Sequence, residues 1–213
     1  MIKAILLVFD PVNTWDDIAQ DRREVSFILF FFLLPLLVVT CGVEGYGMLN
    51  WGKWVDPVAG VKQFKLVEII VNELLHVLLS LLVIFVGAKL LKSLGETFHG
   101  RHTFTQAFRA VAYGLSPMFL LRMLDAFPSM HWWVAWGIGM VLSVAALYHG
   151  IPRVMEPDPP HAFGLYLTSS LLLALAAGLA DFLAAWWMMG RFVTIQTAVN
   201  GFVVTNIVSH LHH

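Results

Sequence analysis

Five apolar stretches, each long enough to cross a lipid bilayer, constrain this chain more than any other feature. A helix needs about 20 apolar residues to cross the hydrocarbon core. Stretches of this length lie at about 25–49, 66–92, 106–127, 131–151 and 163–189. Charged residues make up 13% of the chain, about half of the share in a soluble domain. The sequence therefore predicts an all-α, multi-pass integral membrane bundle of about five transmembrane helices.

The basic residues predict the orientation of these spans. Lys and Arg are enriched in the short cytoplasmic loops of membrane proteins. With five spans, eight of the thirteen basic residues fall on the side of the N-terminus and five on the other side. We therefore expect a cytoplasmic N-terminus and, with an odd number of spans, a tail on the opposite side. The net charge of -1 gives no indication of a nucleic-acid partner.

Residues 1–24 are expected to form an amphipathic segment on the membrane surface, ahead of the spans. Asp10 followed by Pro11 is typical of a helix start. Val12, Trp15 and Ile18 share one helical face, which we expect to contact the bilayer.

The rest of the chain divides in two. Residues 25–190 are predicted to form the five-helix transmembrane domain. Residues 191–213 are predicted to be an interfacial or packed helix, because Gln196, Asn200 and Asn206 weaken them as a further crossing.

Two prolines lie near the middle of predicted spans. Pro35 in the first span and Pro117 in the third each remove one helical hydrogen bond and kink the helix. Either kink could set the packing of the bundle or act as a hinge. The Ser116 hydroxyl could satisfy a carbonyl freed by Pro117. Small residues would let a neighbouring helix approach the third span closely, so we expect this span in the bundle interior; they are Ala107, Ala110, Ala112 and Gly114.

Ionisable groups inside the membrane are costly and are candidates for function. The candidate intramembrane cluster consists of Glu68, Asn72, Glu73 and His76 in the second span and Asp181 in the fifth. The cluster could be a polar stripe that faces the bundle interior or lies near the outer interface, or it could line a proton or solute pathway. Glu73 and His76 also have the Glu-x-x-His spacing of carboxylate metal sites. Since the chain has no second such motif, we expect no metal.

Three further charged residues have simpler interpretations. Arg122 and Asp125 are three residues apart, which predicts an ion pair within one helix. Arg122 could instead pair with Asp181 from another span. Glu44 is expected near the membrane interface.

Three stretches together carry a resemblance to a known family. They are PVNTWDDI at 11–18, followed by the apolar run with Pro35; HGRHTFTQAFRAVAYGLSP at 99–117; and LYHGIPRVMEPDPPHAFGLY at 147–166. Their order and spacing resemble the Yip family of Ypt/Rab-interacting membrane proteins, particularly its short prokaryotic members.

The resemblance implies five membrane helices and a cytoplasmic N-terminus. It also implies a bacterial or archaeal protein of the cytoplasmic (inner) membrane. Eukaryotic relatives are tied to Rab-type GTPases and vesicle traffic, but a Rab-type partner is not expected for a prokaryotic chain. No catalytic residues or cofactors come with the resemblance.

Two functions remain open at this stage. The first is a scaffold that organises the membrane or partner proteins, including further copies of itself. Its candidate cytoplasmic docking residues are Trp15, Arg101, Phe104, Arg109, Pro152 and Arg153. The second is a small proton- or ion-linked transporter or channel that uses the polar residues of the second span. No phosphate loop, nucleophile elbow or cysteine pair is present, so we expect no enzyme.

Overall fold

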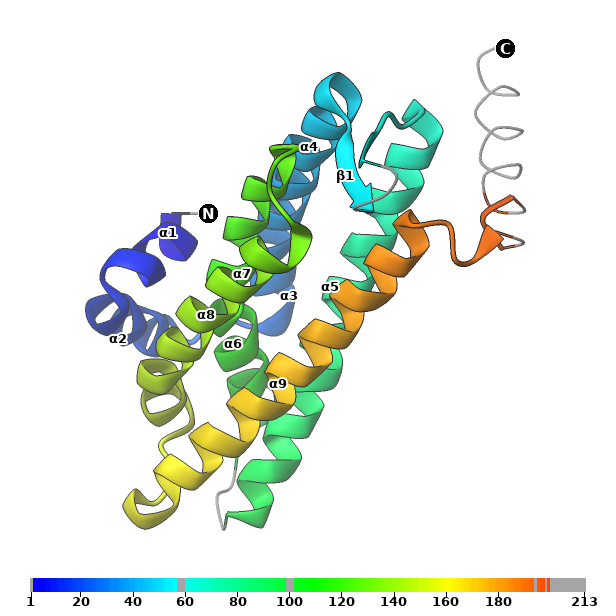
Figure 1. The fold of residues 1–213 in the computed structure, drawn as a ribbon. Coiled ribbons are helices and arrows are strands. Elements are labelled where there is room, and N and C mark those ends of the chain that lie inside the picture. Colours follow the sequence, from blue (N-terminus) through cyan, green and yellow to red (C-terminus); the bar gives the residue numbers. More distant parts are fainter. Residues whose placement is uncertain (1, 57–59, 99–101, 194, 198, 200–213) are drawn as a thin grey trace, which may run out of the picture.

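The computed structural model describes residues 2–56, 60–98, 102–193, 195–197 and 199. In this part of the chain four helices are long and apolar enough to cross a membrane: Val25–Trp51, Leu66–Thr97, Trp133–Met155 and Pro159–Met188. They lie together in one bundle (Figure 1). The predicted all-α membrane bundle is confirmed, but the described residues contain four such helices rather than about five.

The elements follow one another along the chain as follows. Two short N-terminal helices, α1 (Ile2–Phe9) and α2 (Pro11–Asp21), precede a first long helix made of α3 (Val25–Ile28), the π-helical turn η1 (Leu29–Leu33) and α4 (Leu34–Trp51). Next come β1 (Lys53–Asp56), β2 (Gly60–Lys62) and α5 (Leu66–Thr97). The chain continues with α6 (Phe104–Gly114), α7 (Ser116–Leu121), the 3-10 helix η2 (Arg122–Ala126), α8 (Trp132–Met155) and α9 (Pro159–Met188).

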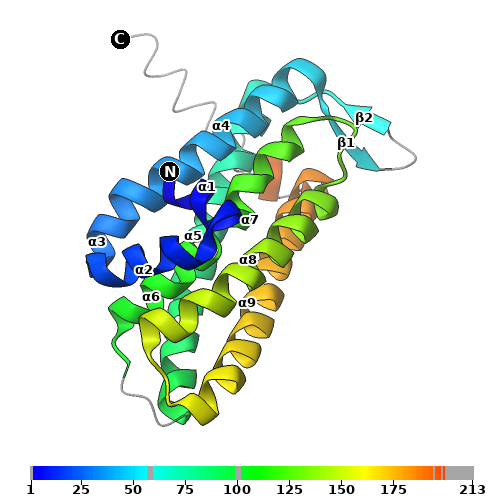
Figure 2. The ribbon, with the colours of Figure 1, turned by 90° about the vertical axis from the view of Figure 1, so that its left-hand side faces the viewer.

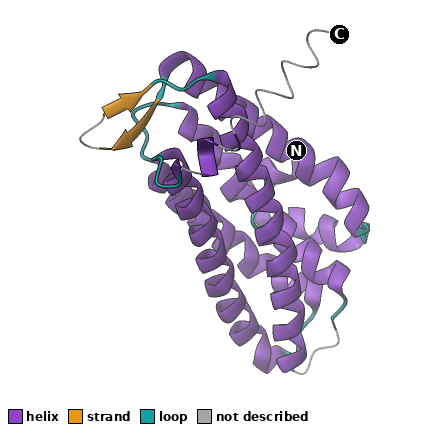
Figure 3. Cartoon of the chain, turned by 90° about the vertical axis from the view of Figure 1, so that its right-hand side faces the viewer, coloured by secondary structure: helices purple, strands orange, loops and turns teal. Residues whose placement is uncertain are grey.

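The two strands pair antiparallel at one end of an otherwise helical molecule (Figure 3). We call this the hairpin end. The opposite end, where residues 156–158 connect α8 to α9, is the connector end.

The third predicted span, 106–127, is not one long helix. It is divided into α6, α7 and η2, which run in series from the connector end to the hairpin end (Figure 1). Pro117 has no N–H, so the carbonyl of Tyr113 loses its usual donor. The Ser116 hydroxyl donates to that carbonyl at 2.6 Å, as predicted, and Met118 N–H donates to Ser143 Oγ of α8 at 3.1 Å. The break explains why the count of long helices falls to four.

The α6 helix is the centre of the bundle. Every residue from Ala107 to Gly114 is buried, so this helix has no face left for lipid. Gly114 gives room to the side chain of Leu147 on α8, which occupies the space that a Cβ would need. The expectation of a packed interior helix is therefore confirmed.

The first long helix contains a widened turn just before Pro35. In η1 the hydrogen bonds follow the π-helical pattern, and Leu34 N–H donates to the carbonyl of Leu29, five residues earlier. Such turns are mostly single insertions within α-helices. Pro35 then begins α4 near its first position, where its missing N–H costs least. Whether this region or Pro117 bends as a hinge remains a prediction.

The N-terminal helices pack on the protein itself (Figure 2). The predicted start of α2 is confirmed, because Asp10 Oδ1 accepts a hydrogen bond from Asn13 N–H and Pro11 opens the helix. Trp15 is fully buried and Ile18 is 1% exposed, since the indole of Trp15 lies directly on Gly150 of α8. The predicted lipid-facing surface of α2 was therefore wrong: these two side chains face the bundle.

A different apolar surface of the N-terminal region is exposed. It belongs to α1, which packs against α7 and leaves four large apolar side chains uncovered: Ile2, Ile5, Leu6 and Phe9. Membrane contact by residues 1–24 therefore remains a prediction, now centred on α1. The predicted C-terminal segment 191–213 lies largely outside the described residues, so its interfacial position also remains a prediction.

Candidate functional site

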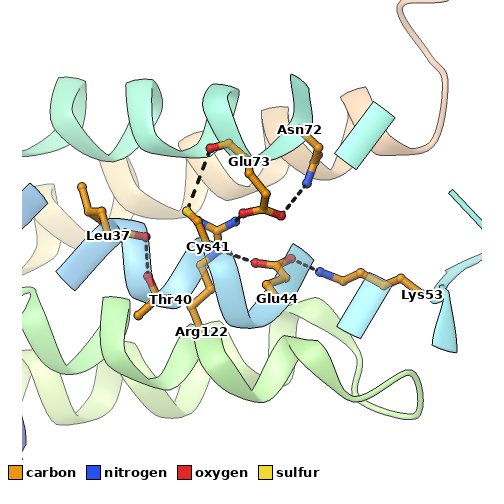
Figure 4. A network of polar contacts seen from close by, with 8 residues as sticks. All are labelled: Leu37, Thr40, Cys41, Glu44, Lys53, Asn72, Glu73 and Arg122. Atoms are coloured by element: carbon orange, nitrogen blue, oxygen red, sulfur yellow. Dashed lines mark hydrogen bonds and ion pairs between the residues drawn. The ribbon is translucent and has the colours of Figure 1, made fainter. Parts of the chain in front are cut away.

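Four charged side chains from four elements meet near the hairpin end (Figure 4). Arg122 of η2 stands between two carboxylates: its Nε lies 2.7 Å from Glu44 Oε2 of α4, and its Nη2 lies 2.9 Å from Glu73 Oε2 of α5. Lys53 of β1 pairs through Nζ with the other oxygen of Glu44. We call this network the outer ion cluster. It connects the first long helix, α5, the strand pair and the series α6, α7 and η2, which we call the broken helix.

The outer ion cluster is shielded from solvent. The side chains of Glu44, Lys53 and Arg122 are 0%, 3% and 10% exposed. Burial acts to lower the pKa of Lys53, but Glu44 and Asp125 outweigh it and hold that pKa above its ordinary value. Lys53 is therefore a cation in this cluster. Burying charges is costly unless they are paired, and here each of these three groups has an ionic partner.

Two neutral side chains complete the network around Glu73. Asn72 Nδ2 donates to Glu73 Oε1 at 3.3 Å. Cys41 Sγ lies 3.5 Å from Arg122 Nη1 and 3.9 Å from the carbonyl oxygen of Glu73. Cys41 is a free, buried cysteine on α4, so its thiol packs between the guanidinium group of Arg122 and the backbone of α5.

Glycines allow the charged elements to approach. The backbone of Ala126 in η2 occupies the space where a Cβ of Gly47 would lie, so α4 and η2 are in direct backbone contact. Gly52, with φ +73°, ends α4 in a conformation that favours glycine. It turns the chain back so that Lys53 reaches Glu44.

A cavity of about 40 Å³ lies beside Arg122. This volume has room for roughly two or three water molecules. Its walls are formed by α5, the broken helix, α8 and α9, together with Lys53 of β1. The cavity is lined by seven polar residues: Lys53, His76, Ser80, Arg122, Asp125, Trp136 and Asp181.

The structure brings together most of the predicted intramembrane cluster. Asn72 and Glu73 belong to the outer ion cluster, while His76 and Asp181 line the adjoining cavity. Glu68 does not join them, because it lies at the start of α5, where its carboxylate accepts a hydrogen bond from Lys65 N–H at 3.1 Å. That bond caps the helix.

The interpretation of Arg122 was wrong, and that of Glu44 stays a prediction. Glu44 is fully buried within the protein, and its depth in the membrane is a separate property. Arg122 does not pair with Asp125 in its own helical segment; it reaches Glu44 and Glu73 instead. The role of Lys53 was not predicted. Its contact with Glu44 depends on the turn at Gly52, and residue spacing within one helix does not reveal a contact with a residue beyond that helix.

Two of the predicted docking residues are not available on the surface. Trp15 is buried against α8, as described above. Arg109 is 6% exposed, and its Nη2 donates to the carbonyl of Arg23 at 2.9 Å. Both were predicted as docking residues, but Trp15 lies between α2 and α8, and Arg109 lies against the backbone of Arg23.

Three other docking candidates, Phe104, Pro152 and Arg153, lie nearer the connector end. Phe104 is half-buried, with its ring centroid 6.0 Å from that of Phe108. Arg153 Nε pairs with Asp16 at 2.6 Å, and Pro152 is exposed. Arg101 lies outside the described residues. Pro152 and Arg153 border an open groove of about 360 Å³ between α8 and α9, whose other lining residues are Tyr148, His149, Pro159, Ala162, Phe163 and Tyr166.

A family model described as the Yip1 domain matches residues 5–203. The chain belongs to the Yip1 domain family. No curated protein and no solved structure gives a significant match. The match begins within α1 and extends past the end of α9. Most of the N-terminal pair, the outer ion cluster and the connector end therefore fall within the Yip domain of this multi-pass membrane protein.

Proposed function

We propose that this Yip family member is a membrane-embedded scaffold, which organises partner proteins or the membrane around it. The observation that carries the proposal is the uneven distribution of polar groups along the bundle. The outer ion cluster and its cavity lie toward the hairpin end, whereas the half toward the connector end is filled mainly by apolar side chains; among these are Ile84, Ala88, Leu91, Phe108, Val111, Leu115, Leu173 and Ala177. Two of the polar side chains buried in that half, Arg109 and Ser169, donate to backbone carbonyls.

This distribution favours a structural role for the buried charges. An ion or proton pathway needs polar groups or water along its whole length. The charges of the outer ion cluster instead neutralise one another and join separate elements. We therefore expect the cluster to stabilise the bundle, in a protein of the cytoplasmic membrane whose N-terminus and connector end face the cytoplasm.

The connector end supplies the surface on which a scaffold would act. The groove bordered by Pro152 and Arg153 presents aromatic rings next to a guanidinium group, a combination enriched at protein interfaces. Phe163 in this groove is 64% exposed. Pro157 in the connector and Pro159 and Pro160 at the start of α9 restrict the backbone beside the groove.

Site-specific photo-crosslinking in native membranes tests the scaffold. A photoreactive residue at Phe163 should capture a protein partner in a stoichiometric complex. The same residue at Val141, a 69% exposed position on the long face of α8, serves as the control and should capture mainly lipid. Repeated recovery of the uncrosslinked protein alone from the Phe163 variant would contradict the proposal.

One observation favours the alternative of a proton- or ion-linked transporter. The cavity lies between α5, the broken helix and α9 and is lined by His76 and Asp181, where such a pathway would begin. Liposomes containing the protein and a pH-sensitive dye separate the two functions. The scaffold predicts no flux above empty liposomes. Flux that is abolished by Glu73→Gln and His76→Ala would establish the transporter instead.

A further inference from the structure

The region around the cavity holds more carboxylates than cations. Its ionisable groups come from β1, α4, α5, η2 and α9. Two are cations, four are carboxyl groups and one is an imidazole. They are, in that order, Lys53 and Arg122; Glu44, Glu73, Asp125 and Asp181; and His76. With His76 neutral and every carboxyl group ionised, the region carries an excess of two negative charges. Such an excess is costly in a low-dielectric interior.

Both cations are already used by other carboxylates. Lys53 pairs with Glu44, and Arg122 pairs with Glu44 and Glu73. Within the part of the chain that the structure describes, neither Asp125 nor Asp181 forms an ion pair. Asp125 is 8% exposed, and its Oδ1 is buried without a hydrogen-bond partner. The two aspartates therefore account for the excess.

Both aspartates line the cavity. Asp125 reaches it from η2 and Asp181 from α9, and Ser80 of α5 adds a hydroxyl to the same wall. The cavity volume of about 40 Å³ accommodates a small ion with one or two waters. Carboxylate and hydroxyl oxygens bind protons and hard metal ions in preference to soft metal ions.

We propose that this cavity binds a small cation between the carboxylates of Asp125 and Asp181. The bound charge offsets the negative excess and joins η2 to α9. A metal ion and a proton would supply the same positive charge to these oxygens. The experiment below distinguishes the two sources, and its readout does not depend on whether the protein is a scaffold.

Thermal unfolding in detergent micelles tests the site with three proteins. They are the wild type, the double variant Asp125→Asn/Asp181→Asn, and the control Glu68→Gln, which removes a carboxylate outside the cavity. In one arm NaCl or CaCl₂ replaces choline chloride at constant ionic strength, pH 8. In the other arm the pH falls from 8 to 5.5 in choline chloride with a chelator present.

A cation that binds only the folded protein raises its Tm as its concentration increases. We expect a rise of several degrees for the wild type and for Glu68→Gln in at least one arm, and none for the double variant. At pH 8 without metal the double variant should have the higher Tm, because it lacks the uncompensated charges.

Each outcome decides between the possibilities. A rise with metal that the double variant loses identifies a metal ion; a rise with acid alone that it loses identifies a proton. Both results support the site. Equal responses of the wild type and the double variant in both arms would overturn it. If the double variant does not fold, Asp125→Asn and Asp181→Asn are measured singly, and each should reduce the rise.

Discussion

The guanidinium group of Arg122 lies 2.7 Å from Glu44 and 2.9 Å from Glu73, and so joins the broken helix to two of the long helices. Removing a buried cation leaves its carboxylates uncompensated, which costs more than the ion pair itself contributes. The buried polar groups of this bundle are therefore the positions where substitutions should affect stability most.

Arg122→Met should lower the free energy of unfolding by about 3–5 kcal/mol, because Glu44 and Glu73 lose a partner in the interior. Unfolding by SDS titration in mixed micelles measures the change. Adding Glu73→Gln to Arg122→Met should recover part of the loss, since one uncompensated charge is removed. If the double variant were less stable than Arg122→Met, the pairing of these two residues would not be what stabilises the bundle.

Ser116→Ala should destabilise the protein by about 1–3 kcal/mol, because the buried carbonyl of Tyr113 then has neither its helical donor nor the hydroxyl. The matched control is Ser170→Ala on α9. The Ser170 hydroxyl is also buried, but its polar neighbour is the hydroxyl group of Tyr166 and not a backbone carbonyl freed by a proline, so its removal should cost less. Equal losses for both variants, measured by the same SDS titration, would argue against the role of Ser116.

Gly150→Ala should loosen the N-terminal helices, because the new methyl group overlaps the indole of Trp15. Overpacking of this kind costs about 1–3 kcal/mol. The rate of thiol labelling of Ala4→Cys, in a Cys41→Ala background, reports the loosening, because Ala4 of α1 is fully buried. Gly137→Ala on the same helix is the control, because no atom lies within 4 Å of its Cβ position. Its labelling rate should match that of the parent.

His102 should make stability depend on pH at the connector end. Burial lowers the pKa of His102 below its ordinary value of 6.5, and Glu96 offsets this only in part. The unfolded chain therefore binds more protons than the folded one as the pH falls through about 6.5, so stability falls with it. His102→Gln removes this contribution, and unfolding between pH 8 and 5 should show a shallower decline. An unchanged slope would mean that other groups dominate this range.

The bundle was predictable because hydrophobic length is a property of the sequence alone. The third span illustrates the limit of that reasoning. Its apolar length indicated a helix, and Pro117 indicated a kink, but the division into three pieces depends on Ser116 and on Ser143 from α8. Partners from another helix cannot be deduced from the spacing within one.

The candidate site was predictable only in part for a related reason. The four-residue repeat on α5 identified a polar face that contains Asn72 and His76, while Glu44 and Lys53 meet through the turn at Gly52. Trp15 shows the complementary difficulty. A helical apolar face that packs on protein has the same spacing as one that lies on lipid, and only Gly150 on the opposing helix distinguishes them.

The complete enclosure of Ala107–Gly114 bears on how the protein is made. Insertion into the membrane proceeds from the N-terminus, so this segment leaves the ribosome before α8 and α9 exist to cover it. Its alanines and Arg109 give it little affinity for lipid on its own. Nascent chains that end before α8 should therefore keep this segment exposed to membrane chaperones, and chains that extend past α9 should release it.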